Sequence, residues 1–118
     1  MSKQKKSVRS SFRKQVFERD RYKCRCCGVK GKDRNSNSKD DLEELDAHHI
    51  KDRSQMPNGG YVKENGISLC SKCHEKAEQF WRTGIAFEGY SPEELYCLIG
   101  SSEEKAIKYS NHTWSSNL

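Results

Sequence analysis

Four of the six cysteines form two Cys-x-x-Cys pairs, Cys24 with Cys27 and Cys70 with Cys73, separated by 42 residues. Two residues between thiolates let one turn present both sulfurs to a tetrahedral ion, and two such turns complete a four-cysteine zinc site. Only 32% of the residues are hydrophobic, so the ion would act as part of a small core. A site of four cysteines has no open coordination position, and we therefore expect this Zn²⁺ to be structural.

The two remaining cysteines are interpreted differently. Cys26 could compete as a ligand, but Cys24 with Cys27 gives the standard spacing. Cys97 falls on the apolar side of a predicted helix and is expected to be a small buried hydrophobe.

Three of the four histidines, His48, His49 and His74, lie near the second cysteine pair in sequence. Neutral imidazoles suit a divalent transition metal or a general base. The zinc site would fix the start of the helix that carries His74 against the strand that ends at His49. The three histidines would then lie close together. They could instead be surface residues or reserve zinc ligands, but their clustering favours function. Adjacent strand residues point to opposite faces, so these residues alone leave open whether His48 or His49 is the base.

Short elements must position these side chains. The hydrophobic periodicity and turn residues predict helices at 12–19, 71–82 and 92–99, one further helical turn after Gly100, and strands at 22–24, 46–50 and 67–69. Residues 28–41 and 51–66 are expected to be loops. Gly84 is typical of the position just past a helix end, and Ser91-Pro92-Glu93-Glu94 predicts a capped helix start.

These motifs, taken in order over roughly residues 12–82, resemble the HNH endonuclease family. The resemblance rests on Cys24…Cys27-Gly28, Leu45-Asp46-Ala47-His48-His49-Ile50, Gly59-Gly60, Asn65-Gly66-Ile67-Ser68-Leu69-Cys70 and Cys73-His74. It implies a small α+β domain built on a ββα-metal (His-Me finger) motif, in which a two-stranded ribbon packs on one helix and grips a divalent ion. The structural four-cysteine zinc site would staple this motif, with flanking helices around it.

The resemblance also implies roles for individual residues. His49 corresponds to the general base, and His48 and His74 correspond to ligands of a catalytic ion, Mg²⁺ or another divalent ion such as Mn²⁺. Asn65 belongs to the catalytic motif, with the expected task of pinning the loop between the strands. In some relatives a helix residue one turn further on adds a ligand. Here that residue is Glu78, for which a solvated carboxylate is the favoured interpretation.

The activity that the resemblance implies is hydrolysis of DNA phosphodiester bonds, leaving 5′-phosphate and 3′-hydroxyl ends. One histidine cluster and no long apolar stripe predict a monomer that nicks double-stranded DNA. A non-catalytic zinc-ribbon DNA-binding or adaptor module would explain the cysteines, but it leaves His48, His49, Asn65 and His74 unexplained as a set. A ribonuclease is a third hypothesis that the fold would permit. Other phage or mobile-element proteins are candidate partners.

Positive charge is concentrated near the N-terminus. Residues 1–34 hold thirteen Lys/Arg and three Asp/Glu, a net of +10, whereas residues 35–118 hold nine and fourteen, a net of −5. This asymmetry favours a polyanion partner such as nucleic acid, with a solvated tail as the alternative. The candidates for phosphate contacts, which position DNA without specifying its sequence, are Arg9, Arg13, Lys14, Arg19, Arg21, Lys23, Arg25, Lys51 and Arg53.

The expected organisation is a flexible basic arm at 1–11, a nuclease core with the zinc knuckle at 12–84, and a helical extension with a mobile end at 85–118. No N-terminal apolar run indicates a signal peptide or membrane span. We therefore expect no membrane contact and a cytoplasmic protein, and the family resemblance implies a bacterial or phage-infected cell. In such a reducing compartment, paired cysteines more often bind metal than form disulfides.

Overall fold

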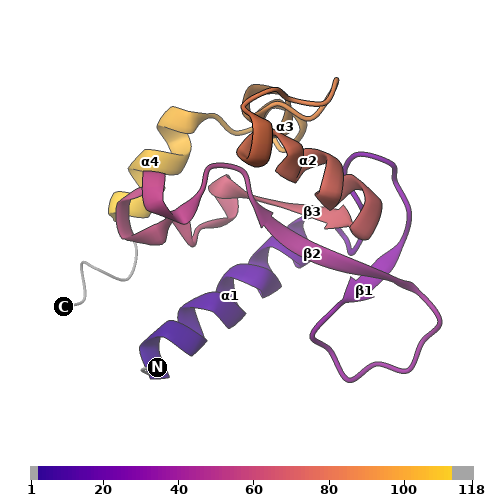
Figure 1. Cartoon of the computed structure of the whole chain (residues 1–118). Helices are drawn as coiled ribbons and strands as arrows, with labels where there is room; N and C mark the ends of the chain where they lie inside the picture. The colour runs from indigo at the N-terminus through magenta and orange to yellow at the C-terminus, as the bar shows by residue number, and fades with distance from the viewer. Residues whose placement is uncertain (1–2, 113–118) are drawn as a thin grey trace.

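The computed structural model describes residues 3–112, in which helices surround a three-stranded sheet (Figure 1). The α-helices are α1 (Lys3–Arg19), α2 (Ser71–Thr83), α3 (Pro92–Leu98) and α4 (Glu103–Asn111), and the strands are β1 (Gly31–Asp33), β2 (Glu43–His49) and β3 (Gly66–Cys70). Three short 3-10 turns, Arg53–Gln55, Pro57–Gly60 and Lys63–Asn65, connect β2 to β3. The small α+β fold expected from the sequence is confirmed.

The central strand β2 pairs in parallel with β1 and antiparallel with β3. In the β2–β3 register, Leu45 lies opposite Cys70 and His49 lies opposite Gly66. The β2–β3 ribbon runs between α1 on one side and α2 on the other (Figure 1). Strands β2 and β3 with helix α2 therefore form the expected ββα unit, and α1 covers its second face. None of the helices within residues 3–112 combines the length and the apolar character needed to cross a membrane.

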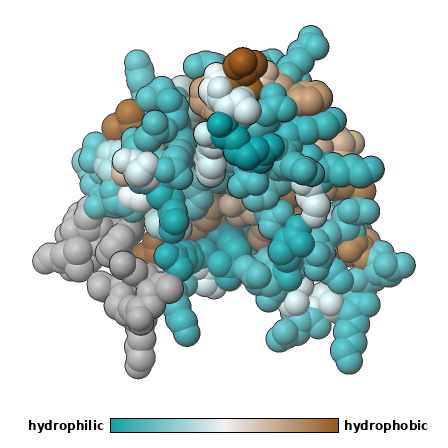
Figure 2. All heavy atoms as spheres, in the orientation of Figure 1, coloured by the Kyte–Doolittle hydropathy of each residue, from teal (hydrophilic) through white to brown (hydrophobic). Residues whose placement is uncertain are grey.

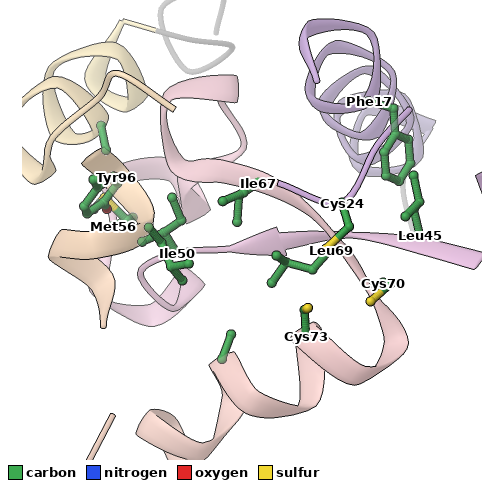
Figure 3. Close-up of a cluster of buried hydrophobic side chains, with 13 residues drawn as sticks. Phe17, Cys24, Leu45, Ile50, Met56, Ile67, Leu69, Cys70, Cys73 and Tyr96 are labelled. Atoms are coloured by element: carbon green, nitrogen blue, oxygen red, sulfur yellow. The ribbon is translucent and has the colours of Figure 1, made fainter. Parts of the chain in front are cut away.

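The buried core is small and contains sulfur atoms among its hydrocarbon side chains. Leu45 and Leu69 are fully buried, and Cys24, Cys70 and Cys73 are at most 6% exposed in the same cluster. Figure 3 shows these cysteines where the cluster meets the first turn of α2. A core with this composition depends on the cysteine sulfurs for part of its packing.

Helix α1 is longer than predicted. The sequence predicted a helix from Phe12 and a flexible arm at residues 1–11, but the helix begins at Lys3, so residues 3–11 are helical. Val8 is partly buried and precedes Phe12 by four residues, as Phe12 precedes Val16. The apolar side of the helix thus continues one turn further toward the N-terminus, and that spacing was the overlooked signal.

The contact between α1 and β3 is close enough to require glycine. A Cβ at Gly66 would lie 2.6 Å from Phe12 Cζ and 2.6 Å from Val16 Cγ2. Helix α1 therefore packs directly on the backbone of β3, opposite the last residue of β2. This packing places α1 beside His49.

Two strand predictions are corrected. The predicted loop at 28–41 contains β1, which is held by parallel pairing with β2. The predicted strand at 22–24 forms only an isolated bridge between Lys23 and Lys30. Strand β1 arises from pairing with a separate segment, which local residue preferences do not encode.

The C-terminal helices match the capping signals but differ in burial. Ser91 and Glu94 form the expected capping box at the start of α3. That helix buries Leu95 and Tyr96, however, so Cys97 is exposed and its predicted burial is wrong. Helix α4 is longer than the single predicted turn. Residues 113–118, on which the predicted mobile end of the extension falls, lie outside the described residues.

Asp20, only 4% exposed, joins four parts of the fold. Its carboxylate accepts hydrogen bonds from Arg19 Nε at 2.8 Å, Arg25 Nη1 at 3.0 Å and the Ser68 backbone N–H at 2.9 Å. Arg19 also donates to the Gly66 carbonyl, and Arg25 donates to the Leu98 carbonyl. Burial alone would raise the pKa of Asp20, but the Arg19 hydrogen bond and charge hold it below its ordinary value.

Replacing Asp20 by Asn should lower the free energy of unfolding by about 2–3 kcal/mol at pH 7, less than for a fully buried pair because both arginines are partly exposed. The folded-state pKa lies below the unfolded value of about 3.9, so this stability is present above that pH and is lost as the pH falls through the folded-state pKa. Urea denaturation of wild type and D20N should show a nearly constant difference from pH 7 down to about pH 5, and a narrowing difference as the pH is lowered below about 4. D41N, which changes an exposed carboxylate, is the control at each pH; equal stability of D20N and wild type at pH 7 would contradict the role given to Asp20.

Candidate metal centre and active site

The two cysteine pairs meet in space. The Sγ atoms of Cys24, Cys27, Cys70 and Cys73 all lie within 4.8 Å of one another, and those of Cys27 and Cys70 are 3.7 Å apart. Within residues 3–112 no other group of three or more His, Cys, Asp or Glu side chains gathers its ligand atoms this closely. The first pair lies in the turn after α1, and the second spans the β3–α2 junction. The four cysteines could hold a structural metal such as zinc, as expected of a zinc knuckle.

The surroundings of the sulfurs favour a thiolate at Cys24. Burial opposes its ionisation, but the backbone N–H groups of Cys27, Cys70 and Cys26 outweigh this effect and lower the pKa of Cys24 to about 7. The Tyr90 hydroxyl donates to Cys73 Sγ at 3.3 Å. Cys26 is outside the cluster, and burial raises its pKa to about 12, so it remains a thiol at neutral pH. The geometry thus selects Cys24 with Cys27 over Cys26.

His48 lies on the side of β2 that faces α2. It is 2% exposed, stacks on Trp81 with ring centroids 4.9 Å apart, and meets His74 edge-on at 5.0 Å. Burial, followed by the neighbouring His74 and His49, lowers the pKa of His48 to about 3. Its Nδ1 is buried without a hydrogen-bond partner. A neutral imidazole with an unsatisfied buried nitrogen, next to a second imidazole, fits a divalent ion.

A carboxylate from β2 orients His74. Asp46 Oδ2 lies 3.1 Å from His74 Nδ1, and His74 Nε2 lies 3.6 Å from Glu78 Oε2. A carboxylate on one ring nitrogen fixes the tautomer and leaves the other nitrogen for a metal. Arg34 in turn donates to both oxygens of Asp46, at 2.9 and 3.1 Å. The sequence reasoning missed Asp46, although a residue two positions before His48 on a strand must share its face.

His49 lies on the opposite face of β2, against α1. Its ring stacks on Phe12 with centroids 4.5 Å apart and meets Tyr61 edge-on at 4.9 Å. Burial, followed by the charge of Arg53, lowers the pKa of His49 to about 4, so the ring is neutral at pH 7. Its Nε2 is buried without a partner. The neutral form is the one that can accept a proton from water.

Asn65 is fully buried and connects the loop after β2 to β3. Its Oδ1 accepts hydrogen bonds from the Lys51 N–H at 3.2 Å and the Tyr96 hydroxyl at 2.7 Å, and its Nδ2 donates to the carbonyls of Lys51 at 3.1 Å and Gly60 at 3.3 Å. Gly60 has φ +67°, and a Cβ there would lie 2.6 Å from Asn65 Nδ2. The amide therefore fixes the loop that begins directly after His49.

The nine basic residues predicted to contact phosphate divide into two groups. Six make contacts within the protein: Arg19 and Arg25 with Asp20, Arg13 with Asp33, Lys51 with Glu103, and Arg9 and Arg53 with Tyr61. The other three, Lys14, Arg21 and Lys23, are exposed. The arginines on Asp20 thus have a structural task, whereas Arg9 and Arg53 converge beside His49.

Residues 24–80 match the family model described as HNH endonuclease. No curated protein and no solved structure was found to match the chain. The matched segment contains both cysteine pairs, the three clustered histidines and Asn65, and the match indicates a nuclease or DNA-binding role. The resemblance inferred from the sequence motifs is therefore confirmed over residues 24–80, the segment that matches the HNH endonuclease model.

Proposed function

We propose that this protein is a metal-dependent endonuclease that hydrolyses DNA phosphodiester bonds and leaves 5′-phosphate and 3′-hydroxyl ends. One observation carries the proposal: within the segment that matches the HNH model, His48 and His49 end strand β2, His74 of α2 meets His48, and each of His48 and His49 has an unpaired buried nitrogen. A zinc module that only bound DNA would have no need of this arrangement.

In this mechanism His49 accepts a proton from the attacking water. Phe12 and Tyr61 hold its ring from two sides, so its orientation is set before substrate arrives. His48 and His74, with Glu78 beside them, would hold a divalent ion such as Mg²⁺ or Mn²⁺. The ion supplies positive charge that stabilises the transition state and the leaving oxygen. Trp81 and Asp46 keep the two ligand rings in place.

We further propose that the protein acts as a monomer on double-stranded DNA in the cytoplasm of a bacterial or phage-infected cell. Each chain supplies a single set of these histidines and would cut one strand at a time. Hydrophilic residues predominate on the face shown in Figure 2, where hydrophobic residues are scattered. Phage or mobile-element proteins are the candidate partners.

Incubation with supercoiled plasmid and Mg²⁺ or Mn²⁺ tests the activity. Open-circle DNA should appear first and linear DNA later, because a single site makes independent nicks. H49A should lower the rate by about 10²–10⁴ with little change in DNA affinity or zinc content. H112A, which removes an exposed histidine outside the site, should cleave like wild type. Binding without cleavage would favour the zinc-ribbon module, and preferential cleavage of a matched RNA would favour a ribonuclease.

Asp46→Asn should raise the metal concentration needed for half-maximal cleavage by about 10–100-fold, because His74 loses the carboxylate that orients it. E44Q is a matched control, since Glu44 also binds Arg34, at 2.7 Å. The two variants disturb the same arginine, but only D46N disturbs His74. An equal metal requirement in D46N, E44Q and wild type would remove Asp46 from the metal site.

We propose that the four-cysteine cluster holds one Zn²⁺ whose binding energy is part of the folding energy. Cys70→Ser should abolish stoichiometric zinc and the cooperative thermal transition. C97S, which changes an exposed cysteine outside the cluster, should retain both, and C26S should retain the zinc. Zinc content can be measured by atomic absorption and folding by circular dichroism. A chelated wild-type protein with an unchanged melting curve would contradict the structural assignment.

A further inference from the structure

A pocket of about 400 Å³ lies beside His49, between α1 and the loop that follows β2. Arg9 from α1, Arg53 from the loop and Tyr61 line it. The Tyr61 ring is the same one that meets His49 edge-on, with centroids 4.9 Å apart. The pocket is therefore adjacent to the proposed base.

Two cations converge in this pocket on one neutral group. Arg9 Nε donates to the Tyr61 hydroxyl oxygen at 3.3 Å, and Arg53 Nη1 donates to the same oxygen at 3.0 Å. A phenol fixes the direction of both guanidinium groups without neutralising their charge. Burial opposes ionisation of Tyr61, but Arg53 and Arg9 outweigh it, and its pKa lies below the ordinary value. The shift reflects the positive potential at this point.

One lining residue, Asp52, carries a negative charge that acts on Arg53, but its side-chain hydrogen bonds are with Ser54 rather than with either guanidinium. Its Oδ2 accepts hydrogen bonds from both the N–H and the hydroxyl of Ser54. Each guanidinium has five N–H donors in a planar fork that suits the oxygens of a phosphate. Two forks aimed at one pocket, held by a common hydroxyl, form a preorganised site for a tetrahedral anion.

We propose that Arg9 and Arg53 together bind one backbone phosphate of the DNA, distinct from the phosphate that is cut, and that Tyr61 is the residue that positions both arginines. This inference rests on the proposed function. The pocket lies on the face of β2 that carries His49, whereas His48 and His74 lie on the other face. The bound phosphate would thus hold the DNA strand against α1 while the scissile phosphate reaches the end of β2.

Equilibrium binding to a short DNA duplex tests the site. The zinc-loaded full-length protein is used without added divalent ion, so the DNA stays intact whether or not the protein is a nuclease. The variants are R9Q, R53Q, the double variant and Y61F, with K39Q as the charge-matched control in the exposed β1–β2 loop. Fluorescence anisotropy over a series of salt concentrations gives the affinity and its salt slope for each variant.

One shared phosphate predicts a distinctive pattern. The double variant should bind about tenfold more weakly than wild type, and its salt slope should shrink by about 0.9, the value for one phosphate. The fold-losses of DNA affinity in R9Q and R53Q, multiplied together, should exceed the fold-loss in the double variant, because both arginines bind the same phosphate. Y61F keeps every charge and should still weaken binding several-fold with an unchanged melting temperature, while K39Q should bind like wild type.

Other results would overturn the inference. A slope reduced by about 1.8, with independent effects of the two arginines, would mean two separate phosphates. Unchanged affinity in the double variant, or Y61F binding like wild type, would mean that the triad only supports the fold. Absence of plasmid cleavage would instead contradict the proposed nuclease activity. The DNA affinities of the variants would still show whether the pocket binds a phosphate.

Discussion

Four cysteine side chains hold together two segments that the sequence separates by 42 residues. Their cluster joins the turn after α1 to the β3–α2 junction, where Cys70 ends the strand and Cys73 lies in the first turn of the helix. Because Cys70 pairs with Leu45 on β2, the cluster also fixes the start of α2 relative to that strand. His74 directly follows Cys73, so its distance from His48 depends on the same sulfurs. In this chain the structural site and the candidate active site share one scaffold.

The alternation of side chains along β2 then divides the chemistry between two faces. Asp46 and His48 point to α2 and meet His74, whereas His49 points to α1 and meets Phe12 and Tyr61. A strand interior could not present both histidines to one phosphate. Under the proposed function they could meet one phosphate beyond the end of the strand, because β2 ends at His49, where the loop held by Asn65 begins.

The sequence revealed features that depend on local spacing and left out those that depend on distant contacts. The cysteine pairs, the capping box at Ser91 and the core side of the ββα unit follow from short-range pattern. The extension of α1 had a weak signal in Val8, because a single apolar residue among lysines and serines also suits a solvated tail. Strand β1 exists through its pairing with β2. Trp81 contacts His48 and Tyr61 contacts His49. Both partners come from segments that lie near the histidines only in the folded chain.

The distribution of charge shows how the basic N-terminal region serves two purposes. Its net charge of +10 over residues 1–34 suggested a uniform electrostatic arm. In the folded chain Asp20 occupies Arg19 and Arg25, and Asp33 lies 3.7 Å from Arg13. These ion pairs remove positive charge from the C-terminal half of α1 and use it to join helix, knuckle and sheet. One turn nearer the N-terminus, Arg9 faces Arg53 across a neutral hydroxyl. Arg9 and Arg53 therefore keep their positive charge beside His49, where a polyanion that reached the proposed base would meet it, while Lys14, Arg21 and Lys23 remain exposed.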